Sequence, residues 1–321
     1  MCTSISMNNG GFCFGRNMDI EFPLETAVVI TPRRHPLHFV SCGDRGEHLA
    51  YIGAAAVREG VPLYCDGMNE AGLCAAALSF PECVYLRGDE GGKHVIAPFE
   101  VIPWVLSQCC DVSQAVALLS ETVLADIPFS ESVPNTPLHW HFSDGSSALV
   151  LECTAEGMKL HHDPTGVLTN SPPFPFHLNN LRQYGHLTAR YPENSGWAEG
   201  MAPFGRGFGA IGLPGDLSPA SRYVRAAFLK LNSPETEQES QRISQLFHIL
   251  ANVAMPRGSV FTQDGREEIT AYSCCMSGTR YLFRTYNDSR IRAVDMAREE
   301  LSGSNLVCYP MEEGNEIVML N

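Results

Sequence analysis

The sequence predicts an α+β fold, because segments typical of strands and segments typical of helices both occur but do not alternate regularly. A doubly wound parallel sheet requires that alternation. The chain has 321 residues, enough to bury one large core or two modest ones. Proline and glycine gather mainly at 171–175 and 203–219, which we interpret as loops, so we expect a single domain over residues 1–321.

The first predicted element is a β-hairpin at the N-terminus. Residues 2–7 and 12–17 are separated by Asn8-Asn9-Gly10-Gly11, and Asn-Gly is a strong signal for a hairpin turn. Such a hairpin folds Arg16 and Asp19 back towards Cys2.

Further strands are predicted at apolar runs rich in residues with high β propensity, several of them joined by turn signals such as Asp144-Gly145. These runs are residues 26–30, 51–57, 72–79, 138–142, 147–153, 269–275 and 280–286.

Helix starts are marked by capping patterns. Asp111 followed by Gln114 forms a capping-box pattern before an apolar run, and Ser218-Pro219 and Ser233-Pro234 each place a capping hydroxyl before a first-turn proline. One further segment has the 3.6-residue period of a core-facing helix. Its apolar positions are Ile243, Leu246, Phe247 and Leu250.

The overall charge excludes some classes of partner. The net charge is −14 at pH 7, whereas surfaces that bind nucleic acids or anionic membranes are usually basic, so we expect neither partner. No apolar run is long enough to span a bilayer, and no signal peptide is recognisable. Together with twelve cysteines, these features favour reduced thiols and a cytoplasmic protein.

Two motifs suggest a metal or a cofactor, but their context argues against both. His139 and His141 alternate along an expected strand and His161-His162-Asp163 follows the next one, yet the spacing is not that of a zinc site. Residues 207–212 have the glycine spacing of a dinucleotide-binding loop, but Leu213-Pro214-Gly215 follows where a helix is needed. We expect no metal and no cofactor.

Cys2 directly follows Met1, so one residue can supply both a nucleophile and a base. Removal of Met1 frees an α-amino group, for which the reference pKa is about 7.7–8.0, against about 8.5 for a thiol. A substantial fraction of neutral amine is then present near pH 7 to take the thiol proton. The alternative is an incidental cysteine near a frayed terminus.

Arg16 and Asp19 fit the first interpretation. A carboxylate beside the new terminus can hold the α-amine, and a nearby guanidinium favours thiolate over thiol. The alternative for this pair is a surface ion pair, which contributes little.

The chain closely resembles the choloylglycine hydrolases, the family of bile salt hydrolases and penicillin V acylases, over nearly its whole length. The matching segments are Met1-Cys2-Thr3, Phe14-Gly15-Arg16-Asn17-Met18-Asp19, Asn69-Glu70 with Gly72-Leu73, Leu138-His139-Trp140, Leu168-Thr169-Asn170 with Pro172, Leu213-Pro214-Gly215-Asp216 and Ser221-Arg222-Tyr223-Val224-Arg225. This resemblance implies a four-layer αββα sandwich of the N-terminal nucleophile hydrolase type. Relatives are often homotetramers.

The resemblance also implies roles for individual residues. Cys2 attacks an amide carbonyl and forms a thioester, and its amine protonates the departing amine and activates water. Arg16 and Asp19 support the nucleophile, Asn170 donates to the oxyanion, and Arg222 belongs to the surrounding polar network. From the residues alone, Asn170 could instead be a turn residue and Arg222 an exposed charge.

The expected substrate is a bile acid conjugated to glycine or taurine. Apolar residues suited to a steroid face are Ile20, Phe22, Leu24, Phe129 and Leu138. Ser79 departs from the family pattern, in which bile salt hydrolases usually have Asn and many penicillin V acylases Tyr, although its backbone N–H could still serve an oxyanion hole.

Two alternatives remain open at this stage, a penicillin V acylase and a catalytically silent binder of amphipathic acids. The resemblance also places a substrate-gating segment at the glycine-rich loop. We expect Gly207-Phe208-Gly209 to favour glycine conjugates over taurine conjugates, because the triplet offers no cation for a sulfonate.

Overall fold

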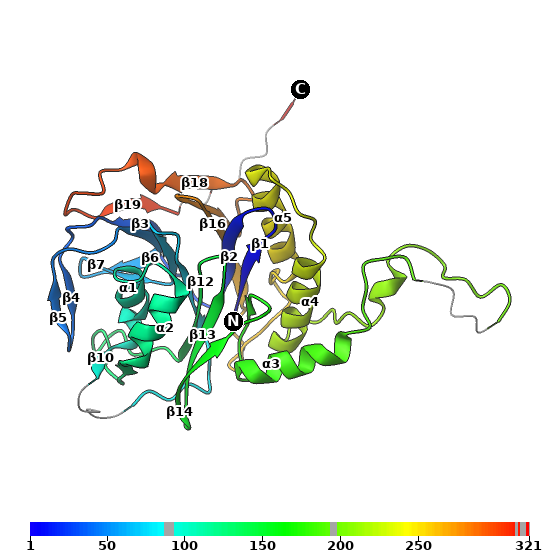
Figure 1. The fold of residues 1–321 in the computed structure, drawn as a ribbon, viewed down its shortest axis with the longest axis horizontal. Coiled ribbons are helices and arrows are strands. Elements are labelled where there is room, and N and C mark those ends of the chain that lie inside the picture. Colours follow the sequence, from blue (N-terminus) through cyan, green and yellow to red (C-terminus); the bar gives the residue numbers. More distant parts are fainter. Residues whose placement is uncertain (87–92, 193–197, 312–313, 315–318, 321) are drawn as a thin grey trace.

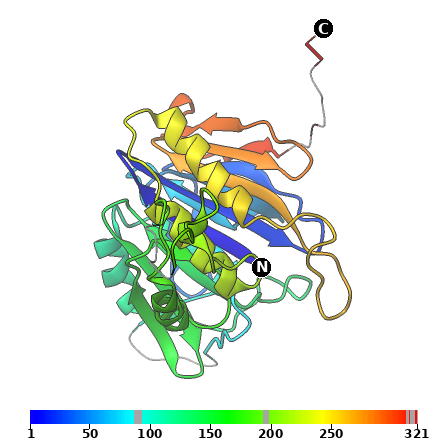
Figure 2. The same ribbon diagram turned by 90° about the vertical axis from the view of Figure 1, so that its right-hand side faces the viewer.

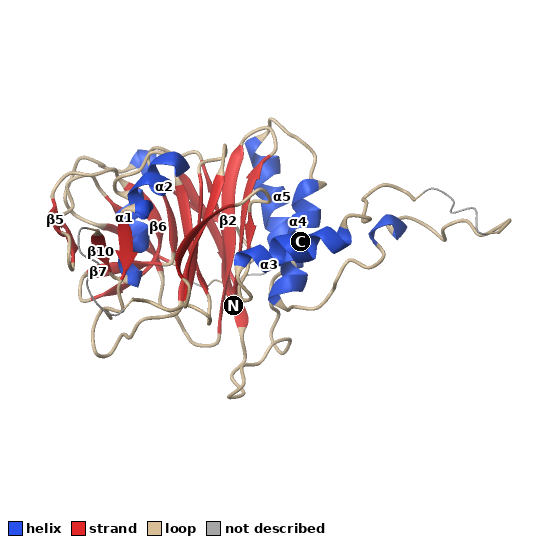
Figure 3. Ribbon diagram, turned by 60° about the horizontal axis from the view of Figure 1, so that its bottom comes forward, coloured by secondary structure: helices blue, strands red, loops and turns tan. Residues whose placement is uncertain are grey.

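Two antiparallel sheets lie face to face, and helices cover the outer face of each (Figures 1 and 3). The structure, a computed structural model, describes residues 1–86, 93–192, 198–311, 314 and 319–320. The predicted four-layer αββα arrangement is therefore confirmed.

The first sheet is built around the N-terminal hairpin. Its strands, in spatial order, are β15 (Val167–Leu168), β1 (Cys2–Asn8), β2 (Phe12–Ile20), β16 (Ile269–Ser277), β17 (Arg280–Thr285) and β18 (Arg292–Asp295). The hairpin forms as predicted, with Cys2 opposite Met18 and Asn8 opposite Phe12. Gly10 has a φ of 77°, a conformation that its lack of a Cβ makes accessible.

The second sheet is larger and carries most of the remaining predicted strands. In spatial order these are β14 (Gly157–His162), β13 (Ala148–Thr154), β12 (Leu138–Ser143), β9 (Cys74–Ser79), β8 (Asp66–Asn69), β6 (Tyr51–Arg58), β3 (Ala27–Thr31) and β19 (Val307–Pro310), with β7 (Val61–Tyr64) paired to β6. Two small sheets pair β10 (His94–Ile96) with β11 (Thr122–Leu124) and β4 (Leu37–Phe39) with β5 (Gly43–Arg45).

Each sheet is covered by its own layer of helices. α1 (Val101–Leu106) and α2 (Val112–Ser120) cover the second sheet, while α3 (Phe174–Leu181), α4 (Pro219–Leu231) and α5 (Glu239–Asn252) lie against the first (Figure 2). Short 3₁₀ turns occur at Pro98–Glu100, Arg182–Tyr184, Phe208–Ala210 and Met296–Arg298.

Two of the predicted helix caps are confirmed and one is wrong. Asp111 accepts a hydrogen bond from the N–H of Gln114, and Ser218 caps α4 ahead of Pro219. Ser233 does not begin a helix, because its hydroxyl instead donates to the carbonyl of Leu229 in the last turn of α4. The next helix begins only at Glu239 and buries the four predicted apolar positions.

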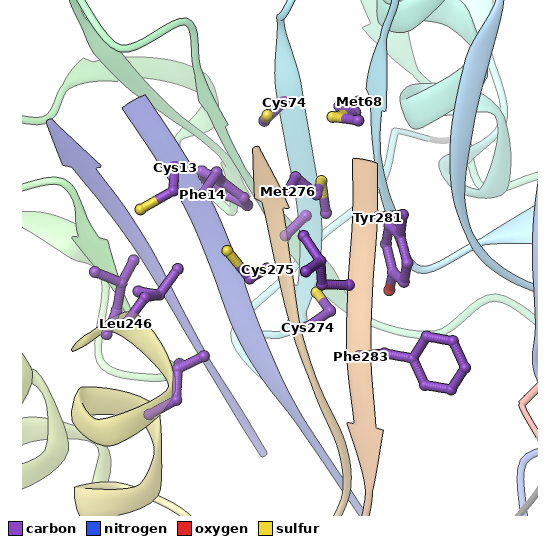
Figure 4. Close-up of a cluster of buried hydrophobic side chains, with 14 of the residues drawn as sticks. Cys13, Phe14, Met68, Cys74, Leu246, Cys274, Cys275, Met276, Tyr281 and Phe283 are labelled. Carbon is purple, nitrogen blue, oxygen red and sulfur yellow. The ribbon is translucent and has the colours of Figure 1, made fainter. Parts of the chain in front are cut away.

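The core is continuous from the space between the sheets to the helices on the first sheet. Figure 4 shows Met68 and Cys74 from the second sheet near Met276 and Tyr281 from the first, with Leu246 of α5 on the other side. A second apolar cluster fills the space under α1 and α2. Because both faces of each large sheet are covered, central strands such as β1, β2, β9 and β16 are mostly buried, whereas the edge strands β14, β18 and β19 are partly exposed.

Between α3 and α4 the chain leaves the body as an arm, which includes the described residues 185–192 and 198–217 (Figures 1 and 3). Within the described part of the chain, no helix combines the length and the hydropathy needed to cross a membrane. All twelve cysteines are free thiols.

Candidate active site

The hairpin register places Arg16 beside Cys2. Cys2 lies opposite Met18, so Arg16 is two residues further along the partner strand on the same face of the sheet. Its Nη2 lies 2.6 Å from Cys2 Sγ. The first sequence expectation, that the turn returns Arg16 to the N-terminus, is met in the structure.

Arg16 has no exposed surface, and its position is fixed by several acceptors. Nη1 donates to the carbonyl of Cys65 at 3.0 Å and to that of Ala77 at 2.9 Å, and it lies 3.8 Å from Asp66 Oδ2. Burial alone lowers the pKa of this guanidinium, but the nearby charges of Cys2, Tyr272 and Asp66 raise it well above its ordinary value. The guanidinium is therefore a fixed cation below the sulfur.

Asp19, at the end of the same strand, is also buried. Its Oδ1 accepts from the hydroxyl of Thr270 at 2.5 Å, and its main-chain oxygen accepts from the Met1 amine at 3.0 Å. Burial raises the pKa of Asp19, while Arg222 and the terminal amine oppose that rise. Asp19 Oδ2 has no hydrogen-bond partner among the described residues, so one carboxylate oxygen remains available next to the terminus.

Asn170 reaches Cys2 from the edge of the first sheet. β15 pairs with β1 through Leu168 and Ser4, so Asn170, two residues beyond Leu168, lies level with Cys2. Its Oδ1 accepts from the main-chain N–H of Cys2 at 2.9 Å, and its Nδ2 donates to the carbonyl of Ser79 at 2.8 Å. Ser79 thus contacts Asn170 through its main chain.

Arg222 projects from the first half of α4 into the same cluster and has no exposed surface. Nη1 donates to the carbonyl of Cys2 and to Oγ1 of Thr3, and Nη2 donates to Oδ1 of Asn170, each at 2.6 Å. Nη1 also lies 4.0 Å from Asp19 Oδ2. Arg222 is therefore not an exposed charge, and the structure brings all the predicted polar residues together around Cys2.

A cavity of about 310 Å³ opens above Cys2 and has a mainly apolar wall. Its lining includes Ser79 and every residue predicted for a steroid face, namely Ile20, Phe22, Leu24, Phe129 and Leu138. Phe129 meets Phe99 edge to face, with 5.4 Å between the ring centroids. The sulfur lies at the boundary between this apolar wall and the buried charges below it.

Met1 lines the same cavity. Its ammonium forms an ion pair with Glu268, a residue that is only 4% exposed. While Met1 is present, the nitrogen of Cys2 belongs to an amide and has no basic lone pair. The free α-amine required for proton transfer therefore depends on removal of Met1.

Several residues around the site were missed by sequence reasoning. Asp66 lies beside Arg16, and Thr270 donates to Asp19. Two histidines, His139 and His177, hold the segment that contains Asn170. His139 Nε2 lies 3.0 Å from the carbonyl of Thr169, and His177 Nε2 lies 2.8 Å from that of Asn170. Their positions depend on contacts across the two sheets, and the only sequence signal was the occurrence of polar residues within apolar strands.

The histidines that suggested a metal have other partners. His139 Nδ1 contacts Glu152 at 3.0 Å, and His141 lies between Ser4 and Asp163, at 2.8 and 3.3 Å. Among the described residues, no group of three or more His, Cys, Asp or Glu side chains has a geometry suited to a metal ion.

The glycine-rich segment does not line this chain's own cavity. Gly207 adopts a φ of 85° and precedes the 3₁₀ turn Phe208–Ala210. This turn belongs to the arm, which extends away from the sheets (Figure 1). Substrate gating by this loop therefore stays a prediction, which the lining of the cavity in one chain does not support.

Comparison with known proteins gives a consistent result. The family model described as linear amide C–N hydrolases, choloylglycine hydrolase family, matches residues 2–309. A bile salt hydrolase/transferase from Lactiplantibacillus plantarum is 41% identical over the full length of both chains. A bile salt hydrolase/transferase from Clostridium perfringens is 37% identical over 96% of each chain.

Solved structures show the same fold. A conjugated bile acid hydrolase from Clostridium perfringens superposes with a TM-score of 0.92 at 34% identity over the full length of both chains. A penicillin V acylase from Agrobacterium tumefaciens has a TM-score of 0.78 at 21% identity, covering 96% of this chain and 90% of its own, which supports the fold alone.

Proposed function

The chain belongs to the choloylglycine hydrolase family of linear amide C–N hydrolases, and we propose that it hydrolyses conjugated bile salts with Cys2 as its nucleophile. The observation that carries this proposal is the position of Cys2 Sγ, 2.6 Å from the buried guanidinium of Arg16 at the base of an apolar cavity. That arrangement places the sulfur of Cys2 between a buried cation and a surface suited to a steroid.

In the proposed first half-reaction, the thiolate attacks the amide carbonyl and a C–S bond forms. The α-amine of mature Cys2 gives a proton to the departing nitrogen as the C–N bond breaks, which releases glycine or taurine and leaves a thioester. In the second half-reaction the amine takes a proton from water, the new C–O bond forms, and the C–S bond breaks. The sulfur returns to its anionic state.

The neighbouring polar groups fit these steps. One hydrogen of Asn170 Nδ2 bonds to Ser79, and the other is available to an oxyanion formed above the sulfur. Asp19 Oδ2 lies 4.0 Å from Nη1 of Arg222, the group that also donates to the carbonyl of Cys2. Arg222 holds the carbonyl of Cys2 and Oδ1 of Asn170, so it positions both the nucleophile and the oxyanion donor.

Conjugated bile salts are the preferred substrates in this proposal. The curated relatives that match along the full chain are named bile salt or conjugated bile acid hydrolases. The apolar wall also suits a steroid, because burying an extra 100 Å² of apolar surface contributes about 2.5 kcal/mol. If the transition state gains that energy, the acyl group dominates selectivity.

We also propose that the arm mediates assembly into a homotetramer. It carries large apolar side chains that are exposed in the isolated chain: Tyr191, Met201, Phe204 and Ile211. Phe204 is 98% exposed, and exposed apolar groups of this kind favour burial against another chain. Light scattering gives the molar mass of the assembly in solution. We expect the mass of a tetramer for the intact protein and a lower mass for a Phe204→Ser variant.

The decisive assay compares glycocholate, taurocholate and penicillin V on one preparation of mature enzyme. We expect kcat/KM to be higher for both bile salts than for penicillin V, and turnover of all three to be abolished in Cys2→Ala. Faster cleavage of penicillin V overturns the substrate assignment. Folded protein that binds bile salts without cleaving any amide supports a silent binder instead.

A further inference from the structure

Asp66 lies at the start of β8, with no exposed surface, on the far side of Arg16 from the nucleophile. Its Oδ2 is 3.8 Å from Nη1 of Arg16, while Nη2 of the same guanidinium contacts Cys2 Sγ. The guanidinium therefore lies between two groups that can carry negative charge. One comes from each sheet, Cys2 from the first and Asp66 from the second.

The carboxylate of Asp66 is held by donors on both oxygens. The hydroxyl of Tyr272 donates to Oδ2 at 2.6 Å, and the hydroxyl of Tyr281 and the N–H of Ala54 donate to Oδ1 at 2.8 and 3.2 Å. Burial raises the pKa of both phenols well above the ordinary range, so they act as neutral donors. Figure 4 shows Tyr281 extending from β17 into the buried cluster.

A buried guanidinium is costly unless an anion stays beside it. Sulfur is an anion only while Cys2 is a thiolate, and it becomes neutral in a thioester. Through the catalytic cycle, Arg16 would therefore lose its nearest anion whenever the enzyme is acylated. Asp66 then supplies a carboxylate 3.8 Å from Nη1 of Arg16. Burial raises the pKa of Asp66, while Arg16 and the three hydrogen-bond donors oppose that rise and favour the charged form.

Building on the proposed nucleophilic role of Cys2, we propose that Asp66 is a positioning residue that acts through Arg16. It is the permanent counter-ion that keeps the guanidinium buried and directed at Sγ, both when the sulfur is charged and when it is acylated. Without the charge of Asp66, the sulfur is the anion in direct contact with Arg16, and the thiolate is favoured over the thiol and the thioester.

The other titratable or charged groups around this unit come from several elements. Those facing Cys2, Arg16 or Asp66 are the terminal amine, Asp19, Cys65, Arg222, Glu268, Tyr272, Cys274 and Tyr281. All of these side chains are still present in an Asp66→Asn variant, which keeps the shape of the side chain and removes its charge. A change in the ionisation of Cys2 can then be assigned to Asp66.

The test measures the rate at which iodoacetamide alkylates Cys2 in mature enzyme as a function of pH, with the modified peptide quantified by mass spectrometry. For Asp66→Asn we expect the midpoint of this pH–rate profile to fall by about one pH unit. That is the size expected for one charge removed from a buried site near the guanidinium. We also expect kcat for glycocholate to fall at least tenfold, on the order of the same charge effect acting on acylation.

Asp163→Asn is the matched control. Asp163 is also a buried carboxylate, bonded to Thr165 and facing His141, but it does not contact Arg16. Removing the charge of Asp163 should change the melting temperature and leave the pH midpoint of Cys2 alkylation at the wild-type value. A folded Asp66→Asn enzyme with an unshifted or raised midpoint overturns the proposal.

A second variant covers the case in which Asp66→Asn fails to fold. If Asp66 balances Arg16, removal of both charges in Asp66→Asn/Arg16→Met should restore a cooperative thermal transition. A double variant no more stable than Asp66→Asn alone overturns the counter-ion role. Failure of the proposed function is a separate result, in which wild-type enzyme keeps its turnover after Cys2 is fully alkylated.

Discussion

The main-chain N–H of Cys2 donates to Oδ1 of Asn170 at 2.9 Å, although 168 residues separate the two in the sequence. The other end of the same amide side chain donates to the carbonyl of Ser79. The orientation of Asn170 is therefore fixed at both ends, and one hydrogen of Nδ2 is left for an oxyanion. Cys2 and Asn170, the proposed nucleophile and oxyanion donor, thus form one hydrogen-bonded unit.

Replacing Asn170 by Ala should lower kcat for glycocholate by a factor of about 10²–10³, the usual cost of removing one oxyanion donor. KM should change little, because the lost interaction forms mainly in the transition state. Steady-state kinetics with both parameters resolved measure this effect. Asn179→Ala, an exposed site on the adjacent α3, is the control and should keep wild-type kinetics. A loss confined to KM would contradict the assigned role.

Active enzyme should begin at Cys2. Intact-mass measurement should show the loss of one methionine, because retained Met1 leaves the Cys2 nitrogen as an amide without a basic lone pair. A variant with one residue inserted between Met1 and Cys2 that persists after processing should fold, with an unchanged circular dichroism spectrum, and have no turnover. Full activity in protein that retains Met1 would exclude the proposed proton transfer.

The sequence predicted the hairpin and the long strands because their signals are local. Asn-Gly marks the turn before β2, and the apolar runs at 269–275 and 280–286 are recognisable as β16 and β17. Short strands such as β8 and β15 were missed, since two to four residues give no usable period. Ser233-Pro234 was misread because the same residues that cap a helix start also end one.

The residues of the site also fall into those that local sequence predicts and those that it does not. Cys2, Arg16 and Asp19 could be joined by reasoning from one hairpin, whereas Asn170 and Arg222 were found only through the family resemblance. Asp66 gave no signal, because its meaning depends on Arg16 lying across the gap between the sheets. Contacts between sheets are set by packing of the whole core, and no short window of sequence contains that information.

His177 should make stability depend on pH. Its Nε2 donates to the carbonyl of Asn170, while Nδ1 is buried with no partner among the described residues. Burial lowers the pKa of His177, because the charged imidazolium would lose its hydration, and the carbonyls of Asn170 and Pro172 only partly oppose this shift. The unfolded chain, with a histidine pKa of about 6.5, then binds more protons than the folded chain below that pH.

This stabilising contribution is complete above about pH 6.5 and is lost as the pH falls towards the lowered pKa of the folded state. Wild-type protein should therefore lose more thermal stability between pH 7 and pH 5 than His177→Gln, which keeps a donor and does not titrate. Burial also lowers the pKa of His161, which titrates in the same window, but that group is present in both proteins and cancels. Parallel melting curves for the two proteins over this range would disprove the assignment.

The last prediction concerns the apolar wall, where Phe22 is 49% exposed at the mouth of the cavity in the absence of substrate. A steroid that covers the remaining half of this ring should gain about 1–1.5 kcal/mol, half the value for burying a whole aromatic side chain. Phe22→Ala should therefore lower kcat/KM for glycocholate by about tenfold and lower that for penicillin V less, because its acyl group is smaller. Phe261→Ala, which removes a ring that is 59% exposed and lies outside the cavity lining, is the control and should leave both values unchanged. Equal losses for the two substrates in Phe22→Ala would mean that Phe22 supports the hairpin rather than the steroid, and a melting temperature lowered by the same substitution would identify that cause.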